Sequence, residues 1–279
     1  MYVKKIWITG ASGRLGSTLY RYLDPLELEI LATDKHVVDI TNSKEVNQFV
    51  DRNRPDIIIN CSGLTKRNYC QEHENEAYLL NGVGAKNIAI ASRRARSKLV
   101  HLSTGDVFDG NTLSPYKETD TANPVTVYGK SKYFGEKMVR QFTPYHFIIR
   151  TSRLYSKENG YVEDIIKQAK ENKEVNVPKN QFASPTSAYE LTKFILYLID
   201  TTEYGTYHAS CKGVCSRKEF AEEVLKILNI NAKVKEVRDE QIDFKPQFLA
   251  LQNFILDITD GYNFSHWKQA LRKYLENEV

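Results

Sequence analysis

The segment KKIWITGASGRLG, residues 4–16, decides the fold of this chain. Its first part, Lys4–Thr9, is apolar and rich in residues that favour strands, and it leads directly into glycines spaced G-x-x-G-x-x-G. Apolar residues at helical spacing follow from Ser12 to Leu23. A strand, a glycine turn and a helix in this order predict the opening unit of a dinucleotide-binding fold.

The rest of the first half repeats this alternation. Further strands are predicted at Glu29–Thr33, Pro55–Asn60, Lys98–Ser103 and His146–Arg150, and a long helix at Glu76–Arg94. Short apolar strands that alternate with helices indicate βαβ units, and therefore a parallel sheet with right-handed crossovers.

The second half is less regular. We predict helices at Tyr161–Glu171, Ser187–Ile199, Ser216–Leu228 and Phe264–Glu276, and a strand at Gly205–Ala209. The expected fold class is α/β, a doubly wound parallel sheet of the Rossmann type with a smaller, interleaved α+β lobe. Residues 1–151 with about 185–210 are assigned to the dinucleotide-binding domain, and about 152–184 with 211–279 to the substrate-binding lobe.

Composition is that of an ordinary folded protein, with 41% hydrophobic and 27% charged residues over 279 positions. The net charge of +4 is spread thinly, and the basic run at 93–98 has no interleaved aromatic residues, so no nucleic-acid partner is expected. No stretch is long and apolar enough to suggest a membrane partner. The four cysteines show no zinc spacing, and without a secretion signal we expect reduced thiols, no metal and a cytoplasmic location.

The glycine turn has the properties of a site for the pyrophosphate of a dinucleotide. Glycines allow close backbone approach, and the helix that follows offers free N–H groups and the positive end of its dipole. An ordinary strand–helix turn is the alternative. The candidate cofactor-binding residues in this turn are Gly10, Ser12, Gly13, Arg14, Leu15 and Gly16.

Residues after the second strand bear on the choice of cofactor. Asp34 stands where an acid would bind the adenosine ribose hydroxyls, which favours NAD. Arg14 and Lys35 flank the same place and would neutralise a 2′-phosphate, which favours NADP, so both remain open. Asp39 and Ile40 are placed against the adenine, with an acid at the start of the next helix as the alternative reading of Asp39.

Two further strand ends are assigned to the cofactor. Cys61, Ser62 and Gly63 follow the third strand, where small residues would let the backbone approach the ligand, although a plain turn is also possible. Ser103, at the end of the fourth strand, is assigned to the same site.

The block from Ser103 to Glu136 carries the groups for carbonyl chemistry. Tyr128 and Lys132 lie four residues apart, which places them on one face of a helix. The ammonium group would lower the phenol pKa and hold the nicotinamide ribose, so that Tyr128 could act as a general acid. Thr104, at the carboxyl end of a strand, could hydrogen-bond the substrate oxygen.

A second Tyr-x-x-x-Lys pair, Tyr133 and Lys137, follows five residues later. Five residues rotate a helix well past a quarter turn, so both pairs cannot face one cleft. We choose the first pair because it begins the helix, and we interpret the second as a packing or solvated pair.

These motifs together resemble the extended short-chain dehydrogenase/reductases and, within them, the dTDP-4-dehydrorhamnose reductase family. The resemblance covers nearly the whole chain and rests on GASGRLG, VFDG, PYKETD, YGKSKYFGE, RTSRLYS and SPTSAYEL. It implies a nucleotide-sugar substrate, NADPH or NADH as cofactor, and Thr104, Tyr128 and Lys132 as catalytic residues. The implied reaction is reduction of a nucleotide-linked 4-keto-6-deoxy sugar, above all dTDP-4-dehydrorhamnose to dTDP-L-rhamnose for cell-surface polysaccharide, by a monomer or homodimer.

The chain departs from the family where the family holds its sugar. Gly105-Asp106 replaces Asp-Tyr, Arg153 replaces a tryptophan, and the loop at 64–69 brings Lys66 and Arg67. Thr104, Gly105, Asp106 and Arg153 are therefore the predicted substrate-binding residues. Either the ligand is a different, more anionic one, or the same substrate is kept through compensating changes.

Two other functions remain open. One is an epimerase, or a reductase of another nucleotide sugar. The other is a non-catalytic NAD(P)-binding regulatory subunit, which the presence of all three catalytic side chains disfavours. The closing acids Glu276 and Glu278 are too generic to assign a metal between subunits.

Overall fold

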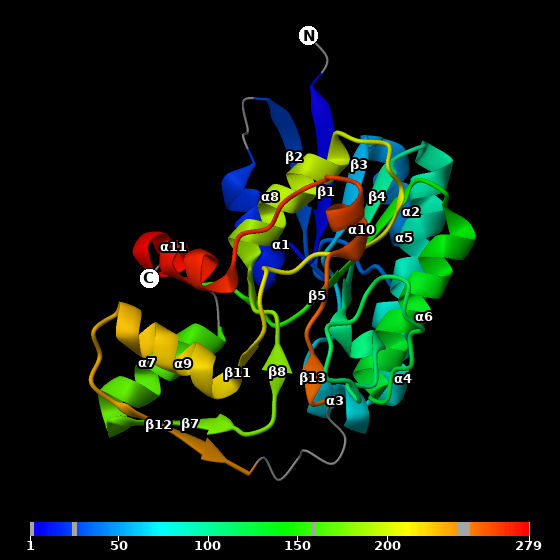
Figure 1. Ribbon diagram of the computed structural model, residues 1–279. Helices are drawn as coiled ribbons and strands as arrows, with labels where there is room; N and C mark the ends of the chain where they lie inside the picture. The colour runs from blue at the N-terminus through cyan, green and yellow to red at the C-terminus, as the bar shows by residue number, and fades with distance from the viewer. Residues whose placement is uncertain (1–2, 24–26, 158–159, 239–245, 279) are drawn as a thin grey trace.

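The computed structural model describes residues 3–23, 27–157, 160–238 and 246–278. Its centre is a six-stranded sheet in the order β10-β5-β4-β3-β1-β2, in which every neighbouring pair is parallel (Figure 1). The strands are β1 (Lys4–Thr9), β2 (Leu28–Thr33), β3 (Ile57–Asn60), β4 (Lys98–Thr104), β5 (His146–Thr151) and β10 (Gly205–His208).

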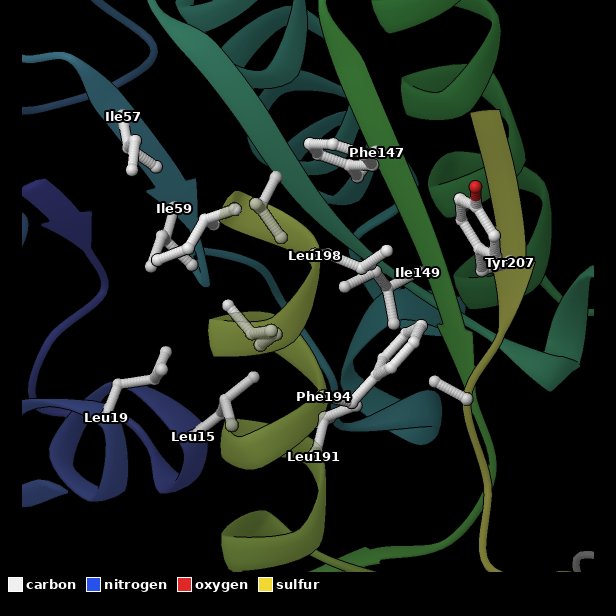
Figure 2. Packing of buried hydrophobic residues seen from close by; sticks show 14 of the residues in the cluster. Leu15, Leu19, Ile57, Ile59, Phe147, Ile149, Leu191, Phe194, Leu198 and Tyr207 are labelled. Atoms are coloured by element: carbon white, nitrogen blue, oxygen red, sulfur yellow. The ribbon is translucent and has the colours of Figure 1, made fainter. Parts of the chain in front are cut away.

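Helices cover both faces of this sheet because both faces of each central strand are apolar. On one face, Ile57 and Ile59 of β3 pack with α1 (Arg14–Tyr22) and α8 (Ala188–Ile199), as Figure 2 shows. On the other face, Ile58 packs with α2 (Ser43–Asn53) and α5 (Ala85–Ala95), and Val139 of α6 (Val127–Phe142) joins the same cluster. The α/β, doubly wound prediction is confirmed.

The strand order reverses beside β1, which pairs with β2 on one side and β3 on the other. The connections that leave β1 and β3 therefore diverge to opposite faces and open a crevice at the carboxyl ends of these strands. Ligands in open α/β sheets bind at such a switch point. The glycine turn at residues 10–16 lies at this end of β1.

A second, smaller core lies beyond this end of the sheet (Figure 1). It is built by α7 (Tyr161–Asn172), α9 (Arg217–Ile227), α11 (Trp267–Glu278) and the parallel pair β7 (Glu174–Pro178) and β12 (Lys233–Val237). Short strands join it to the sheet region: β6 (Leu154–Tyr155), β8 (Phe182–Ala183), β9 (Thr186–Ser187), β11 (Cys215–Ser216) and β13 (Phe248–Leu249).

The chain passes between the two regions several times, so the predicted boundaries at 151, about 185, 210 and 211 stay a prediction. One segment differs from that division. Leu256 of α10 (Phe254–Ile258) and Phe264 fall inside the predicted lobe, yet they pack in the sheet-side cluster with α8. Their apolar side chains pack against α8 and do not join the core of the lobe.

The helix predicted at Glu76–Arg94 is divided. It consists of α4 (Glu74–Tyr78), a π-helical turn η1 (Leu79–Gly84) and α5, preceded by the short α3 (Arg67–Glu72). A side chain at Gly82 would strike Phe134, and one at Gly84 would strike Ile40. Close packing of this turn against α6 accompanies the wider winding, which simple periodicity does not reveal. Among the described residues, no helix is long and apolar enough to span a bilayer.

Candidate active site

The glycine turn is shaped by close backbone contacts. Gly10 has φ +64°, and a Cβ there would come within 2.8 Å of the Ser62 nitrogen. A Cβ at Gly16 would come within 2.3 Å of the Gly10 carbonyl oxygen. Gly13 is the N-cap of α1 and its first turn has no side-chain cap, so free N–H groups face outward. This is the donor set that a pyrophosphate requires, so the turn fits a dinucleotide.

A cavity of about 740 Å³ extends from this turn to the smaller core. It is lined by residues at the ends of β1, β3, β4 and β5, by α6, and by segments of the second core around β8 and α9. Predicted site residues on its wall are Ser12, Gly13, Arg14, Leu15, Gly16, Cys61, Ser62, Gly63, Ser103, Thr104, Asp106, Tyr128, Lys132 and Arg153.

The three predicted catalytic side chains meet on one wall of this cavity. Thr104 ends β4, while Tyr128 and Lys132 lie one turn apart at the start of α6. The helix begins where it does because the Thr126 hydroxyl accepts a hydrogen bond from the Gly129 N–H at 3.0 Å. The Thr104 hydroxyl acts on the Tyr128 phenol and favours its ionised form. All three are buried.

The pKa of Tyr128 runs opposite to the sequence-based expectation. Burial, and then the charge of Asp106, raise it to about 12, while the Thr104 hydroxyl, Arg67 and Arg14 act to lower it. Sequence reasoning predicts a lowered pKa through Lys132, whereas the net shift is upward and the main groups that act on the phenol do not include Lys132. The phenol therefore holds its proton at neutral pH and is a weaker acid than an unperturbed tyrosine, since a general acid works best with a pKa near the working pH.

Lys132 is fixed by the strand beneath it. Its Nζ donates to the Leu102 carbonyl oxygen at 2.5 Å, and burial lowers its pKa to about 8 even though Glu136 acts to raise it. The ammonium group lies close to Gly63, where a Cβ would be 3.6 Å away. Lys132 is therefore placed at the junction of the β3 and β4 strand ends.

Several predicted cofactor residues lie outside the cavity wall. Asp39 accepts hydrogen bonds from the Thr41 N–H and hydroxyl, the turn before α2 that its alternative reading describes. Ile40 is buried against Gly84 in the core. Gly10 supports the turn from behind, and a cofactor role for Asp39 and Ile40 stays a prediction.

The second-strand residues remain compatible with either cofactor. Asp34 follows β2 and accepts a hydrogen bond from the His36 N–H at 2.9 Å, and Lys35 is exposed beside it. Arg14 lines the cavity and donates to the Leu154 carbonyl oxygen at 3.2 Å. Neither Asp34 nor Lys35 contributes to the cavity wall. Their positions therefore do not decide between NAD, which Asp34 favours, and NADP, which Lys35 favours.

The second tyrosine–lysine pair turns away from the cavity. The Lys137 ammonium group lies 4.6 Å from the centre of the Tyr133 ring, and Tyr133 packs in a separate cluster with Phe108. The choice of Tyr128 and Lys132 thus agrees with the geometry.

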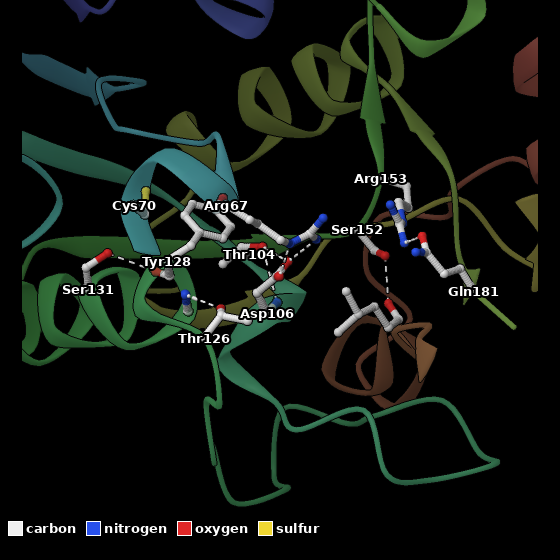
Figure 3. Close-up of polar contacts among 12 residues, drawn as sticks. Arg67, Cys70, Thr104, Asp106, Thr126, Tyr128, Ser131, Ser152, Arg153 and Gln181 are labelled. Atoms are coloured by element: carbon white, nitrogen blue, oxygen red, sulfur yellow. Dashed lines mark hydrogen bonds and ion pairs between the residues drawn. The ribbon is translucent and has the colours of Figure 1, made fainter. Parts of the chain in front are cut away.

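On the substrate side, Asp106 is held by a residue of the 64–69 loop to which the sequence assigned no role. Arg67, the first residue of α3, donates to both Asp106 carboxylate oxygens, at 2.5 and 2.7 Å. Asp106 is 3% exposed, and it also accepts from the Thr104 hydroxyl at 3.0 Å (Figure 3). Gly105 lies behind this pair against Leu251 and not on the cavity wall.

Arg153 heads a second group of polar side chains. Its Nη2 donates to the Gln181 side chain at 2.7 Å, while its Nε is buried and has no partner in the described part of the chain. Burial, and then the charge of Arg67, lower its pKa to about 10. Arg217 shares Gln181 and stacks on Tyr161, 4.1 Å from the ring centre. All four of these side chains line the cavity.

Tyr161, Gln181 and Arg217 are site residues that sequence reasoning missed, while Arg67 is named there in the 64–69 loop but given no role. The sequence did hold an indication of the pair that Arg67 forms with Asp106. Compared with the family, Arg67 is an added cation after β3, and Asp106 is an added carboxylate after the neighbouring strand β4. The other three lie in the irregular half, where no strand periodicity fixes which side chains face the cleft.

A model of the RmlD substrate binding domain matches residues 4–279 of this chain. The spore coat polysaccharide biosynthesis protein SpsK of Bacillus subtilis is 34% identical, over 98% of this chain and 97% of its own length. The chain belongs to the RmlD substrate-binding domain family. The prediction of this reductase family is thereby confirmed.

Two other relatives of this RmlD-family chain carry more specific names. A dTDP-4-keto-6-deoxy-D-glucose reductase of Streptomyces niveus is 30% identical, over 95% of this chain and 94% of the relative. A crystal structure of dTDP-4-dehydrorhamnose reductase from Bacillus anthracis, in complex with NADP, superposes with a TM-score of 0.95. That structure is 36% identical and covers 99% of both chains.

Proposed function

We propose that this protein reduces the keto group of a dTDP-linked 4-keto-6-deoxy sugar with NADPH or NADH. One observation carries the proposal: Thr104, Tyr128 and Lys132 share a cavity with a glycine turn shaped for a pyrophosphate. The named relatives support it, since one is a dTDP-4-keto-6-deoxy-D-glucose reductase and another binds NADP.

The chemistry divides between the bound cofactor and the protein. A reduced nicotinamide supplies the hydride to the carbonyl carbon. Tyr128 donates its proton to the carbonyl oxygen, Thr104 hydrogen-bonds that oxygen, and Lys132 holds the nicotinamide ribose. The raised pKa of Tyr128 keeps the phenol protonated across the neutral range but makes its proton harder to release.

The leading substrate is dTDP-4-dehydrorhamnose, which would give dTDP-L-rhamnose. Arg153 and Arg217 line the cavity, where an anionic diphosphate would compensate their charge. Among the described residues of the cavity wall, Asp106 is the only carboxylate, and Arg67 already neutralises it. An anionic nucleotide sugar therefore suits this wall.

A panel of nucleotide-linked 4-keto sugars, assayed with NADPH and with NADH, tests the proposal. Oxidation of the cofactor with a 4-keto-6-deoxy substrate, and a reduced sugar in the product, is the expected result. Conversion of a sugar without net cofactor consumption would instead show an epimerase. A protein that binds cofactor and converts no sugar of the panel would point to a regulatory subunit.

Tyr128→Phe supplies the residue-level test. Turnover should fall by about 10²-fold or more because the proton donor is lost, while NADPH still binds. Tyr133→Phe is the matched control, since it removes a phenol from the same helix outside the cavity. Equal activity of the Tyr128→Phe variant and the wild-type protein would refute the assignment.

A further inference from the structure

Three hydrogen-bonded side chains and the proposed proton donor lie together on the cavity wall. Arg67 binds Asp106 and Asp106 accepts from Thr104 (Figure 3), and the Thr104 hydroxyl in turn acts on the Tyr128 phenol. They come from separate elements: α3, the 3-10 turn η2 (Gly105–Val107), the end of β4, and α6. Arg67 and Asp106 belong to none of the catalytic roles given above.

The Asp106 carboxylate is held in its charged form. Burial alone would raise its pKa, but the charge and hydrogen bonds of Arg67, with Arg153 and Thr104, lower it. The Asp106 N–H also donates to the Thr104 oxygen at 3.2 Å, so this oxygen is fixed beside the carboxylate. A buried, ionised acceptor thus stands 3.0 Å from a hydroxyl of the proposed catalytic set.

The Thr104 hydroxyl has one hydrogen and so can serve one acceptor at a time. In the structure that hydrogen points to Asp106. During reduction two other acceptors need it: the substrate oxygen, and the Tyr128 phenolate left after proton donation. How tightly Asp106 retains the hydrogen therefore affects the energy of the transition state.

We propose that Arg67 and Asp106 are positioning residues, which control where the Thr104 hydroxyl hydrogen points and thereby how readily Tyr128 releases its proton. The inference rests on the proposed function, because it assigns Tyr128 as the acid. Arg67 shares the Asp106 charge between two strong hydrogen bonds, which weakens the competing bond from Thr104.

The proton balance of the step is simple. The Tyr128 proton passes to the substrate oxygen, which has received the hydride at its carbon, and Tyr128 becomes a phenolate. The Thr104 hydrogen then rotates from Asp106 toward the phenolate and stays on Thr104. Asp106 remains ionised throughout, paired with Arg67.

Other charged groups also act on the pKa of Tyr128. Arg14 of α1 and Arg67 of α3 lower its pKa, and Asp106 of η2 raises it. Lys132 lies one turn away on the same helix, and Arg153 acts on Asp106 from beyond β5. Removing the Asp106 charge should lower the pKa of Tyr128, and removing the Arg67 charge should raise it.

The test is a pH titration of tyrosinate absorbance in the protein loaded with NADP⁺. Each variant is compared with the same variant carrying Tyr128→Phe, so that the other tyrosines cancel. Asp106→Asn should lower the pKa of Tyr128 by roughly one to three units, because a nearby like charge is lost and Thr104 is free to donate. Arg67→Met should move it upward.

A third variant separates positioning from charge alone. In a Thr104→Val background the hydroxyl is missing, so Asp106→Asn should shift the titration by less than it does with Thr104 present. An equal shift in both backgrounds, or no shift at all, would overturn the proposal. The titration uses no sugar, so it gives an answer even if the 4-keto sugar panel fails.

Kinetics supply the second readout once a substrate is in hand. Arg67→Met should lower kcat on the order of tenfold, with a smaller change in KM for the sugar. A rise in KM at constant kcat would instead make Arg67 and Asp106 simple sugar contacts and overturn the positioning role. Asp109→Asn is the control, since this acid binds Tyr116 away from the cavity.

If Arg67→Met fails to fold, as judged by NADP⁺ binding, Arg67→Lys is used instead. It keeps the charge and loses the paired hydrogen bonds, so kcat should fall below that of the wild-type protein and the alkaline limb of the pH–rate profile should move upward. An Arg67→Lys protein with an unchanged limb and unchanged kcat would count against the proposal.

Discussion

At the scale of single residues, Arg153 combines a strained backbone conformation with a buried charged side chain. Its backbone lies in the left-handed region, with φ +48°, although it is not glycine. Strain of this kind costs about 1–3 kcal/mol and clusters at ligand sites. Its Nε is buried without a partner among the residues that the structure describes, and the nearby Arg67 adds like charge. The side chain therefore gains most from an anionic ligand.

Arg153→Met should weaken binding of the nucleotide sugar, with KM rising by about tenfold or more, because a buried charge contact is worth about 2–5 kcal/mol. kcat should change less, since the side-chain hydrogen bond of Arg153 goes to Gln181 and not to Thr104 or Tyr128. Initial rates at saturating NADPH would measure this. Arg94→Met is the control: this arginine pairs with Asp51 on the surface. Unchanged KM in the Arg153 variant would exclude a role in substrate binding.

At the scale of elements, α6 owes its position to one buried carboxylate. Glu136 accepts from Ser103 of β4 at 2.6 Å, from Arg150 of β5 at 2.8 and 2.9 Å, and from Arg140 at 2.8 Å. It lies one turn after Lys132, so this cluster fixes the helix that carries Tyr128 and Lys132. The hydroxyl of Ser103, a predicted cofactor residue, thus donates its hydrogen to Glu136 of α6.

Glu136→Gln should lower the free energy of unfolding at pH 7 by about 3 kcal/mol, because the buried Arg150 loses its counter-charge. In the wild-type protein, Arg150, Arg140 and Ser103 lower the pKa of Glu136 to about 2, although burial acts to raise it. A lowered carboxylate pKa stabilises the fold above the unfolded value near 4.5, and this contribution is lost as pH falls toward 2. Urea unfolding of both proteins at several pH values would show the difference shrinking in acid.

Glu222→Gln serves as its control. This residue is about half exposed and lies 3.9 Å from Lys218, so its loss should change stability by less than about 1 kcal/mol. A Glu136→Gln protein as stable as this control would show that α6 is held by apolar packing instead.

At the scale of the whole molecule, two cores share one cavity. The sheet region contributes the glycine turn and Tyr128, and the smaller core contributes Gln181 and Arg217. Because a ligand in this cavity contacts both regions, its binding should stabilise both together. A ligand at about 100 times its Kd stabilises a fold by about 2.7 kcal/mol.

The melting temperature should therefore rise with NADPH or NADH, and the larger rise identifies the preferred cofactor. Gly13→Asp should abolish that rise, because a carboxylate at the start of α1 repels a pyrophosphate. The same carboxylate can cap the helix, since Gly13 is an extended N-cap without a side-chain cap, so the variant should remain folded. A full cofactor-induced rise in Gly13→Asp would place the pyrophosphate elsewhere.

Much of the site follows from local sequence. The strand, glycine turn and helix at residues 4–16 dictate a βα unit, and Tyr128 and Lys132 must share a helix face once α6 forms. Family and fold class follow from such patterns and are confirmed. The catalytic and cofactor roles rest on the same patterns and stay predictions for the experiments above.

Other properties depend on residues that only folding brings together. Arg67 and Asp106 are 39 positions apart, and no periodicity predicts that they form a pair. The pKa of Tyr128 is raised because burial and Asp106 outweigh the cations, and burial cannot be read from a four-residue spacing. The spacing of residues in the sequence determined which chemical groups lie near one strand end of this protein. Distance and desolvation, which exist only in the tertiary structure, decided how those groups are charged.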